Sequence, residues 1–306
     1  MNILFNASQC GLSNNGGSKT IIRCAETLQD MGYNVGIWAQ VNKYTWHKPS
    51  IEVIKDCPYI DSKGRAIPWH KEIVVSVWEI EELFDYNDYL GHFVWYMRGW
   101  EQWVKGEEWL IQQIKKFVDA GGRIIVNSSW LIDQLKEKCG VDSVLCWAGL
   151  DLDFWKKKYT WDFPAIGSLG DCKHKSKRDD LSYRLAGASG AKWLCANGRL
   201  TEIEMRLLYN ECKIWFAPTE LEGFHQCPAE ANLCGCLVVC NRMPSNGMGD
   251  YATDETAMRY NTWEELIECI ENPDFSKVPK MQKVLREKIG SREDNMKIFV
   301  EILRGQ

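Results

Sequence analysis

The chain has 306 residues, of which 45% are hydrophobic and 26% charged, and its formal net charge is −5. These values are typical of a soluble globular protein and exclude collagen-like, coiled-coil and disordered classes. The length predicts two domains. Residues 1–155 carry 15 Lys/Arg against 20 Asp/Glu, whereas residues 156–306 carry 22 of each. The negative first half argues against a protein whose whole surface binds a polyanion.

The first forty residues are predicted to form one βαβ unit. An apolar strand at residues 2–5 is followed by a glycine-containing loop, a helix at 18–31 and a second strand at 34–39. Further apolar runs lie at residues 73–78, 93–97, 123–127 and 143–147, with helical stretches at 108–119 and 130–138. Strands that alternate with helices indicate a parallel sheet covered on both faces.

A second alternating series follows a linker-like segment at residues 149–158. Strands are predicted at residues 165–169, 192–196, 214–217 and 236–240, and helices at 202–210, 262–271 and 279–303. We therefore expect an α/β protein with two doubly wound, Rossmann-like domains facing a central cleft, at residues 1–152 and 153–285. In such sheets the ligand lies at the carboxyl ends of the strands, near the topological switch point.

The cysteines and the N-terminus bear on the cell compartment. The chain has 13 cysteines, and their densest stretch, residues 227–240, contains no C-x-x-C pair. Buried thiols are therefore favoured over a structural metal site, and so many unpaired thiols indicate a reducing compartment. The start MNILFNAS has no basic region and only a short apolar stretch, which predicts no signal peptide. No stretch approaches the roughly 18 apolar residues of a membrane span, so we expect a cytoplasmic protein without membrane insertion.

The most informative stretch covers residues 216–249. A loop carrying Glu222 follows a strand, and Pro228 is expected to be the first residue of a helix that contains Glu230 in its first turn. Backbone N–H groups at a helix N-terminus bind anions, and a carboxylate accepts two hydroxyl hydrogen bonds at once. The pattern favours a ligand with phosphate and hydroxyl groups. The alternative is that Glu230 only complements the helix dipole and Glu222 is a solvated loop charge.

The spacing of these glutamates also resembles a known motif. Residues 222–230, EGFHQCPAE, resemble the E-x7-E region of retaining glycosyltransferases of family 4, which have the GT-B fold. Residues 14–32, 96–103, 145–154 and 197–224 resemble other segments of that family in the same order. The resemblance implies metal-independent transfer of a sugar from a nucleotide-sugar donor to an acceptor hydroxyl, with no cofactor. It also implies that the last helix, about residues 286–306, crosses back onto the first domain.

The resemblance assigns roles to single residues around the E-x7-E motif. Glu230 would hold the ribose hydroxyls, and Glu222 would contact the transferred sugar. Gly223 and the backbones of Phe224 and His225 would lie near the sugar and the diphosphate. The resemblance implies that the main catalytic task of the protein is to stabilise the negative charge on the departing diphosphate.

Other donor-binding roles fall outside the motif. Gly16 and Gly17 would let a loop of the first domain approach the diphosphate, because glycine has no side chain to block it. The backbone around Asn197 would contact the edge of the nucleotide base. Lys175 is preferred as the phosphate-binding and catalytic lysine, with Lys173 as the runner-up.

The family pattern is broken at two points. Ser168 stands where the family has a phosphate-binding arginine, and Lys177 and Arg178 are candidates to replace that charge. A histidine that several members place near the sugar has no convincing counterpart in His92. These departures keep open a second interpretation, a catalytically degenerate nucleotide-sugar or glycan-binding protein of the same fold.

A phosphorylase or a dehydrogenase is a third reading. The dehydrogenase is disfavoured because no G-x-G-x-x-G follows the first strand. The triplet Asp151–Leu152–Asp153 matches the metal-binding D-x-D pattern but falls in the linker, so no metal is expected.

The acceptor side belongs to the first domain in this family. Arg98, Trp100 and Glu101 are the candidates, although Arg98 and Glu101 could equally pair with each other. The first half also holds 11 of the 15 tryptophans, most of which we expect in the core. Aromatic faces stack on sugars or on a flipped-out base. The acceptor is expected to be a soluble glycan or small molecule, or DNA bearing hydroxymethylated pyrimidines in a virus.

Overall fold

The computed structural model describes residues 1–7, 12, 16–39, 46–54, 72–76, 93–100, 105–159, 165–170, 175–243 and 247–305. The chain divides into two compact units. Unit 1 comprises Met1–Ala148 and Arg292–Gln306, and unit 2 comprises Gly149–Ser291. The boundaries expected from the sequence, at residues 152 and 285, lie a few residues away. Each unit has a parallel sheet of its own.

The sheet of unit 1 has the strand order β3-β2-β1-β4-β5-β6-β7, and all neighbouring strands are parallel. The order reverses between β1 and β4, which is therefore the topological switch point. The strands are β1 (Asn2–Asn6), β2 (Asn34–Trp38), β3 (Glu52–Ile54), β4 (Glu72–Ser76), β5 (Phe93–Met97), β6 (Arg123–Val126) and β7 (Val144–Leu145).

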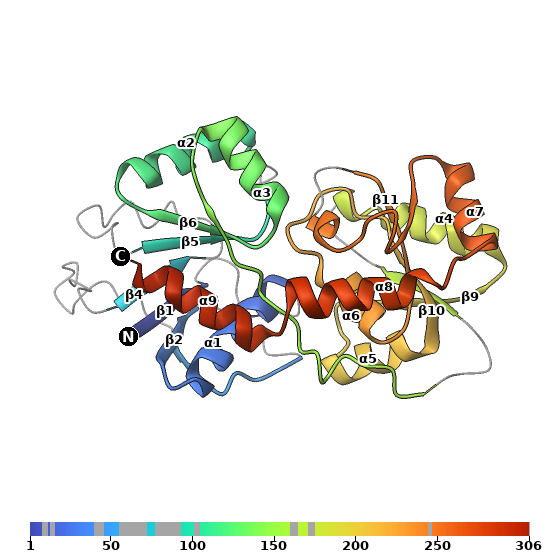
Figure 1. The fold of residues 1–306 in the computed structure, drawn as a ribbon, viewed down its shortest axis with the longest axis horizontal. Helices are drawn as coiled ribbons and strands as arrows, with labels where there is room; N and C mark the ends of the chain where they lie inside the picture. Colours follow the sequence, from blue (N-terminus) through green and yellow to red (C-terminus); the bar gives the residue numbers. More distant parts are fainter. Residues whose placement is uncertain are drawn as a thin grey trace. The chain divides into compact units, whose positions relative to one another are not determined.

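Helices cover both faces of this sheet (Figure 1). On one face lie α1 (Gly16–Asp30) and α9 (Arg292–Arg304), and on the other lie α2 (Glu107–Asp119) and α3 (Ser129–Gln134). Successive residues of β5 point to opposite faces: Trp95 lies 6.0 Å from Phe117 of α2, and Tyr96 lies 5.5 Å from Phe299 of α9, between ring centroids. Because both faces are covered, β5 is apolar throughout.

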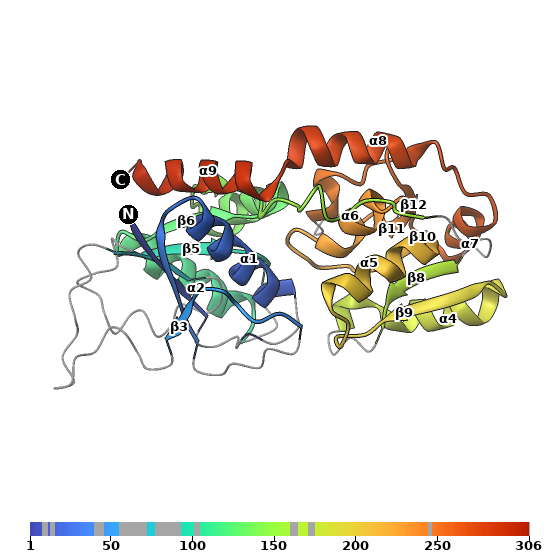
Figure 2. The same ribbon diagram turned by 90° about the horizontal axis from the view of Figure 1, so that it is seen from below.

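The last helix belongs to unit 1. Met296, Phe299 and Leu303 of α9 share a buried cluster with residues of α1, and the two helices lie side by side (Figure 2). The single helix expected at residues 279–303 is in fact two. The chain passes through α8 (Lys277–Val284) and a π-helical turn (Leu285–Ile289), and then Gly290 breaks the helix with a φ of 77°. Its ψ is −178°, and this combination of positive φ and extended ψ is open almost only to glycine.

The sheet of unit 2 has the order β12-β11-β10-β8-β9, again with all neighbours parallel. Its switch point lies between β8 and β10, from which the chain builds outward in both directions. The strands are β8 (Ala165–Leu169), β9 (Lys192–Ala196), β10 (Cys212–Ala217), β11 (Leu237–Asn241) and β12 (Met258–Tyr260).

Two sets of helices cover the faces of this second sheet (Figure 1). On one face α4 (Asp179–Ser189) and α7 (Trp263–Glu271) bury Leu185 and Leu266 in a cluster with Phe216 of β10. On the other face lie α5 (Glu202–Glu211), α6 (Gln226–Leu233) and α8, and Trp215 of β10 meets Tyr209 of α5 at 4.8 Å. None of the helices described is long and apolar enough to cross a membrane.

Candidate functional site

The candidate site lies in unit 2, where β8 and β10 end at the switch point. A segment of residues 175–178 follows β8, and a loop of residues 218–225 follows β10. The two are joined by a backbone hydrogen bond of 2.8 Å, which Glu220 N–H donates to the carbonyl of Ser176. Arg178 has a φ of 51°, the one positive value among the described residues other than glycines. Such conformations are strained and gather at functional sites.

An ion pair connects the two segments. Lys177 pairs with Glu222, and each side chain is 25% exposed. Lys175 is exposed, and Lys173 lies outside the described residues. Residues 175–177 form a single 3₁₀ turn, in which successive side chains point about 120° apart, so Lys175 and Lys177 face different ways. Of the two described lysines, the fold brings Lys177 to the first glutamate of the E-x7-E motif.

His225 lies next to this pair and is buried, with only 4% of its surface exposed. Burial, reinforced by the positive charge of Lys177, holds the pKa of His225 well below its usual 6.5. The imidazole is therefore neutral and carries one donor and one acceptor nitrogen. Neither ring nitrogen has a hydrogen-bond partner among the described residues. A buried polar side chain in this position is available to a ligand.

The loop around His225 is fixed by a residue that the sequence did not single out. The Tyr251 hydroxyl donates a hydrogen bond of 2.5 Å to the backbone carbonyl of His225, and its ring lies 5.3 Å from that of Phe224. Gly223 is buried beside them. The backbone of Glu222 is held as well, because its carbonyl accepts the Gly247 N–H at 3.1 Å.

Helix α6 begins earlier than the sequence predicted. It starts at Gln226, so Pro228 is its third residue rather than its first, and Glu230 lies in the second turn. Proline is tolerated there because the first-turn N–H groups have no partner within the helix. The N-cap is His225, whose side chain does not cap the helix. The N-terminus of α6 is thus suited to an anion.

Glu230 lies deeper than a surface carboxylate, with 2% of its area exposed. The hydroxyl of Tyr209 donates to its Oε2 at 3.4 Å. Tyr209 itself is buried, with ring contacts to Trp155 at 5.6 Å and Trp215 at 4.8 Å. A buried carboxylate needs such partners. Tyr209 lies on the buried face of α5, where sequence patterns indicate only a core residue.

Two further predicted positions lie along the same carboxyl edge of the sheet. Asn197 is exposed in the turn after β9, where its Oδ1 accepts the Arg199 N–H at 3.1 Å. Ser168 is fully buried in β8, with its hydroxyl 4.0 Å from the Cys195 sulfur. Ser168 supplies no charge, and the described segment that follows its strand carries Lys175, Lys177 and Arg178.

The candidates in unit 1 have different surroundings. Gly16 and Gly17 are the first residues of α1 rather than part of a loop, and a Cβ added at Gly16 would meet nothing within 4 Å. Arg98 is 8% exposed. Trp100 is 2% exposed, and its indole N–H donates to Glu107 Oε1 at 3.0 Å, which is the environment of a core tryptophan. Glu101 and His92 lie outside the described residues.

The described His, Cys, Asp and Glu side chains were the candidates for metal binding, and the cysteines for thiol chemistry. In the part of the chain that the structure describes, no group of three or more His, Cys, Asp or Glu side chains is placed to hold a metal ion. Asp151 of the D-x-D triplet accepts the Phe154 N–H at 2.9 Å and so closes a turn. The ten cysteines within the described ranges are all free thiols, and most are buried.

No family model and no curated protein matches this chain. Solved structures with a similar fold do match it. Sucrose-phosphate synthase from Thermosynechococcus elongatus superposes with a TM-score of 0.73 at 12% identity, over 100% of this chain and 98% of that one. HepE from Anabaena, in complex with UDP and glucose, gives 0.73 at 12% identity over the whole of both chains.

An alpha-glucosyltransferase in complex with UDP and a 13-mer DNA containing an HMU base gives a TM-score of 0.59 at 12% identity, over 99% of each chain. These matches extend over the full length of both partners. They confirm the fold class predicted from the sequence: the chain has the α/β fold of the GT-B glycosyltransferases.

Proposed function

We propose that this chain is a retaining glycosyltransferase that moves a sugar from a nucleotide-sugar donor to an acceptor hydroxyl. The observation that carries the proposal is the cluster of Lys177, Glu222 and His225 at the N-terminus of α6, at the switch point of a GT-B chain. A cation, a carboxylate and the positive end of a helix together match a ligand that has both phosphates and sugar hydroxyls. Both HepE and the alpha-glucosyltransferase were solved with UDP, which makes UDP-sugars the first donors to test.

The proposed reaction breaks the bond between the anomeric carbon and the diphosphate while the acceptor hydroxyl attacks the same face. Negative charge then grows on the departing diphosphate. Lys177 and the first-turn amides of α6 stabilise that charge. Such stabilisation by fixed charges and dipoles is usually the largest single contribution to the rate enhancement. Lys177 can bind the diphosphate only if its ammonium group leaves Glu222 or pairs with both groups at once.

Glu222 then accepts hydrogen bonds from hydroxyls of the transferred sugar, and Glu230 accepts those of the ribose. His225, neutral and without a described partner, donates to or accepts from the sugar or the diphosphate. Tyr209 and Tyr251 are positioning residues, because they act through Glu230 and through the His225 backbone.

We also propose that the reaction needs no metal ion, since Lys177 and the helix amides supply positive charge to the diphosphate. Turnover is expected to be the same with and without EDTA. Loss of turnover in EDTA that Mg²⁺ restores would overturn this part of the proposal.

The acceptor is proposed to be a soluble glycan or small molecule. DNA bearing hydroxymethylated pyrimidines is the second candidate, which the alpha-glucosyltransferase bound to HMU-containing DNA favours. The free thiols of the described part agree with a reducing, cytoplasmic location.

The deciding experiment incubates the protein with a panel of UDP-sugars and three acceptor classes: oligosaccharides, small alcohols and hydroxymethyl-base DNA. Products are read by mass spectrometry, and Glu222→Gln serves as the inactive control. Transfer that retains the anomeric configuration supports the proposal, and a DNA product that falls steeply with added salt supports the second candidate. If UDP binds but the protein neither transfers the sugar nor slowly hydrolyses the donor, a degenerate binding protein is favoured instead.

A further inference from the structure

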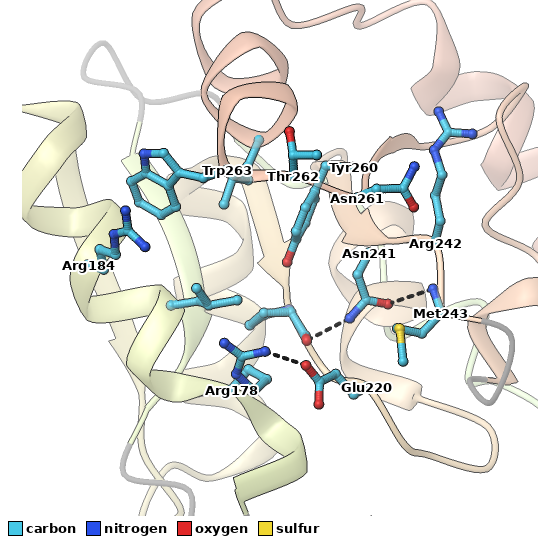
Figure 3. Close-up of a pocket in the computed structure, with 13 residues that line it drawn as sticks. Arg178, Arg184, Glu220, Asn241, Arg242, Met243, Tyr260, Asn261, Thr262 and Trp263 are labelled. Carbon is cyan, nitrogen blue, oxygen red and sulfur yellow. Dashed lines mark hydrogen bonds and ion pairs between the residues drawn. The ribbon is translucent and has the colours of Figure 1, made fainter.

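A pocket lies in unit 2, on the face of the sheet covered by α4 and α7 (Figure 3). Its volume is about 240 Å³. The ends of β10, β11 and β12 form its floor, and its lining includes Arg178, Arg184, Glu220, Asn241, Tyr260 and Trp263. We call it the α4–α7 pocket.

The polar groups on the floor of the α4–α7 pocket are satisfied, with one exception. The Asn241 side-chain amide donates to the carbonyls of Pro218 and Thr219 at 2.7 and 2.9 Å, and its oxygen accepts the Met243 N–H at 3.2 Å. The exception is Tyr260, which is 5% exposed and whose hydroxyl has no partner among the residues that the structure describes.

The Tyr260 hydroxyl is directed toward the side of the pocket where Arg178 and Glu220 lie (Figure 3). Burial raises the pKa of Tyr260, so the hydroxyl keeps its proton and remains a hydrogen-bond donor. Leaving a buried hydroxyl unpaired is unfavourable. An unpaired hydroxyl on an otherwise satisfied floor points to a ligand that accepts a hydrogen bond.

Two guanidinium groups border the same space. Arg178 pairs with Glu220 and also with Asp180, whose oxygens accept its Nε–H and Nη2–H at 3.0 and 3.2 Å. Arg184 lies over the Trp263 ring with its guanidinium carbon 3.8 Å from the ring centroid. Arg184 is exposed and makes no ion pair with a described residue. Arg242 also lines the pocket but turns to Asp254, at 2.8 Å. Stacking fixes the Arg184 plane while its N–H donors stay available to an anion.

We propose that the α4–α7 pocket is a second binding site, which takes the phosphate group of a small organic phosphate. Arg184 and the Tyr260 hydroxyl donate to the phosphate oxygens, and Arg178, which also pairs with Glu220 and Asp180, adds positive charge nearby. The fork of a guanidinium group donates two parallel N–H groups to two oxygens of one phosphate.

This site is separate from the proposed donor site, although the same two segments build both. Lys177 and Glu222 pair on the donor side, and Arg178 and Glu220 pair on the pocket side. The proposal does not depend on the glycosyltransferase activity. Phosphate bound in the α4–α7 pocket must therefore survive when UDP occupies the donor site.

The test measures equilibrium dialysis of radiolabelled inorganic phosphate against the whole chain, with and without saturating UDP. We expect about one phosphate per chain that UDP does not displace. Tyr260→Phe and Arg184→Gln should each weaken its binding by about tenfold or more, as expected for a hydrogen bond to a charged group. Lys192→Gln, an exposed lysine of the same unit, is the matched control and should bind phosphate like the wild type.

Thermal unfolding in phosphate-free buffer shows whether these variants fold. Tyr260→Phe removes an unpaired buried hydroxyl, so its unfolding midpoint should be unchanged or higher while its phosphate binding falls. A purely structural tyrosine would not separate the two readouts. No bound phosphate at millimolar concentration, complete displacement by UDP, or wild-type binding by both variants would each overturn the proposal.

Discussion

The switch points of the two sheets carry different chemistry. In unit 1, the described residues beyond β1 that bear on a donor are Gly16 and Gly17, which offer only the backbone of the α1 N-terminus. In unit 2, the segments after β8 and β10 present a lysine, a glutamate and a buried neutral histidine at the N-terminus of α6. Under the proposed function, we therefore expect donor recognition and leaving-group stabilisation to depend mainly on side chains of unit 2. The contribution of unit 1 to the donor is expected to come from main-chain groups.

The largest effect is expected from the lysine of unit 2. Lys177→Gln removes a positive charge next to the departing diphosphate, and loss of one such stabilising group lowers kcat by about 10²- to 10³-fold. Lys175→Gln is the matched control, since it removes the same charge two residues away at an exposed position. Steady-state kinetics with a UDP-sugar measure both. A large loss in Lys175→Gln with normal turnover in Lys177→Gln would reverse the assignment.

The next largest effect separates the two glutamates. Glu230→Gln should weaken UDP binding by about 1.5–3 kcal/mol, because it replaces a charged acceptor of ribose hydroxyls by a neutral one. Glu222→Gln should leave UDP affinity nearly unchanged, since UDP lacks the sugar that this carboxylate contacts, and should lower turnover instead. Calorimetry with UDP gives the affinities, and circular dichroism controls for the buried change at Glu230. Unchanged UDP affinity in Glu230→Gln would remove its ribose role.

Much of the fold of both units could be predicted from the sequence. The alternation of apolar strands and amphipathic helices specified two parallel sheets, because period-2 and period-3.6 patterns are local properties of the chain. The spacing of Glu222 and Glu230 and the switch-point rule pointed to the candidate site, whose role stays a prediction. Two predictions were wrong for a local reason: the start of α6 was placed at Pro228, and the helix break at Gly290 was missed. Proline is allowed anywhere in a first helical turn, and a single glycine can either continue or end a helix.

Contacts between distant segments were beyond the reach of sequence patterns. The choice among Lys173, Lys175 and Lys177 depends on the pitch of a short 3₁₀ turn and on a backbone bond to another loop. The support of Glu230 by Tyr209 joins two helices, and the unpaired hydroxyl of Tyr260 is defined by what surrounds it. Such features follow from packing, which a one-dimensional pattern does not encode.

A smaller effect concerns the stability of unit 2 as the pH changes. The pKa of His225 is depressed in the folded chain, so as the pH falls the unfolded chain binds the proton first. The stability that depends on neutral His225 is complete above about pH 6.5 and falls by up to about 1.4 kcal/mol per pH unit below it. Urea unfolding of the wild type and of His225→Asn between pH 7.5 and 5.5 measures the difference. Parallel loss of stability in both proteins would contradict a buried neutral imidazole.

The smallest effect is expected in unit 1, where only the backbone is involved. A Cβ at Gly16 meets nothing in the chain itself, so Gly16→Ala should fold normally, and its unfolding midpoint should be unchanged or slightly higher because alanine favours helix over glycine by about 1 kcal/mol. If the α1 N-terminus approaches the diphosphate, the added methyl group should weaken UDP binding severalfold. Exposed Gly187, in the interior of α4, is the matched control, since a Cβ there also meets nothing within 4 Å. Equal UDP affinities in Gly16→Ala, Gly187→Ala and the wild type would show that unit 1 takes no part in holding the donor phosphates through this glycine.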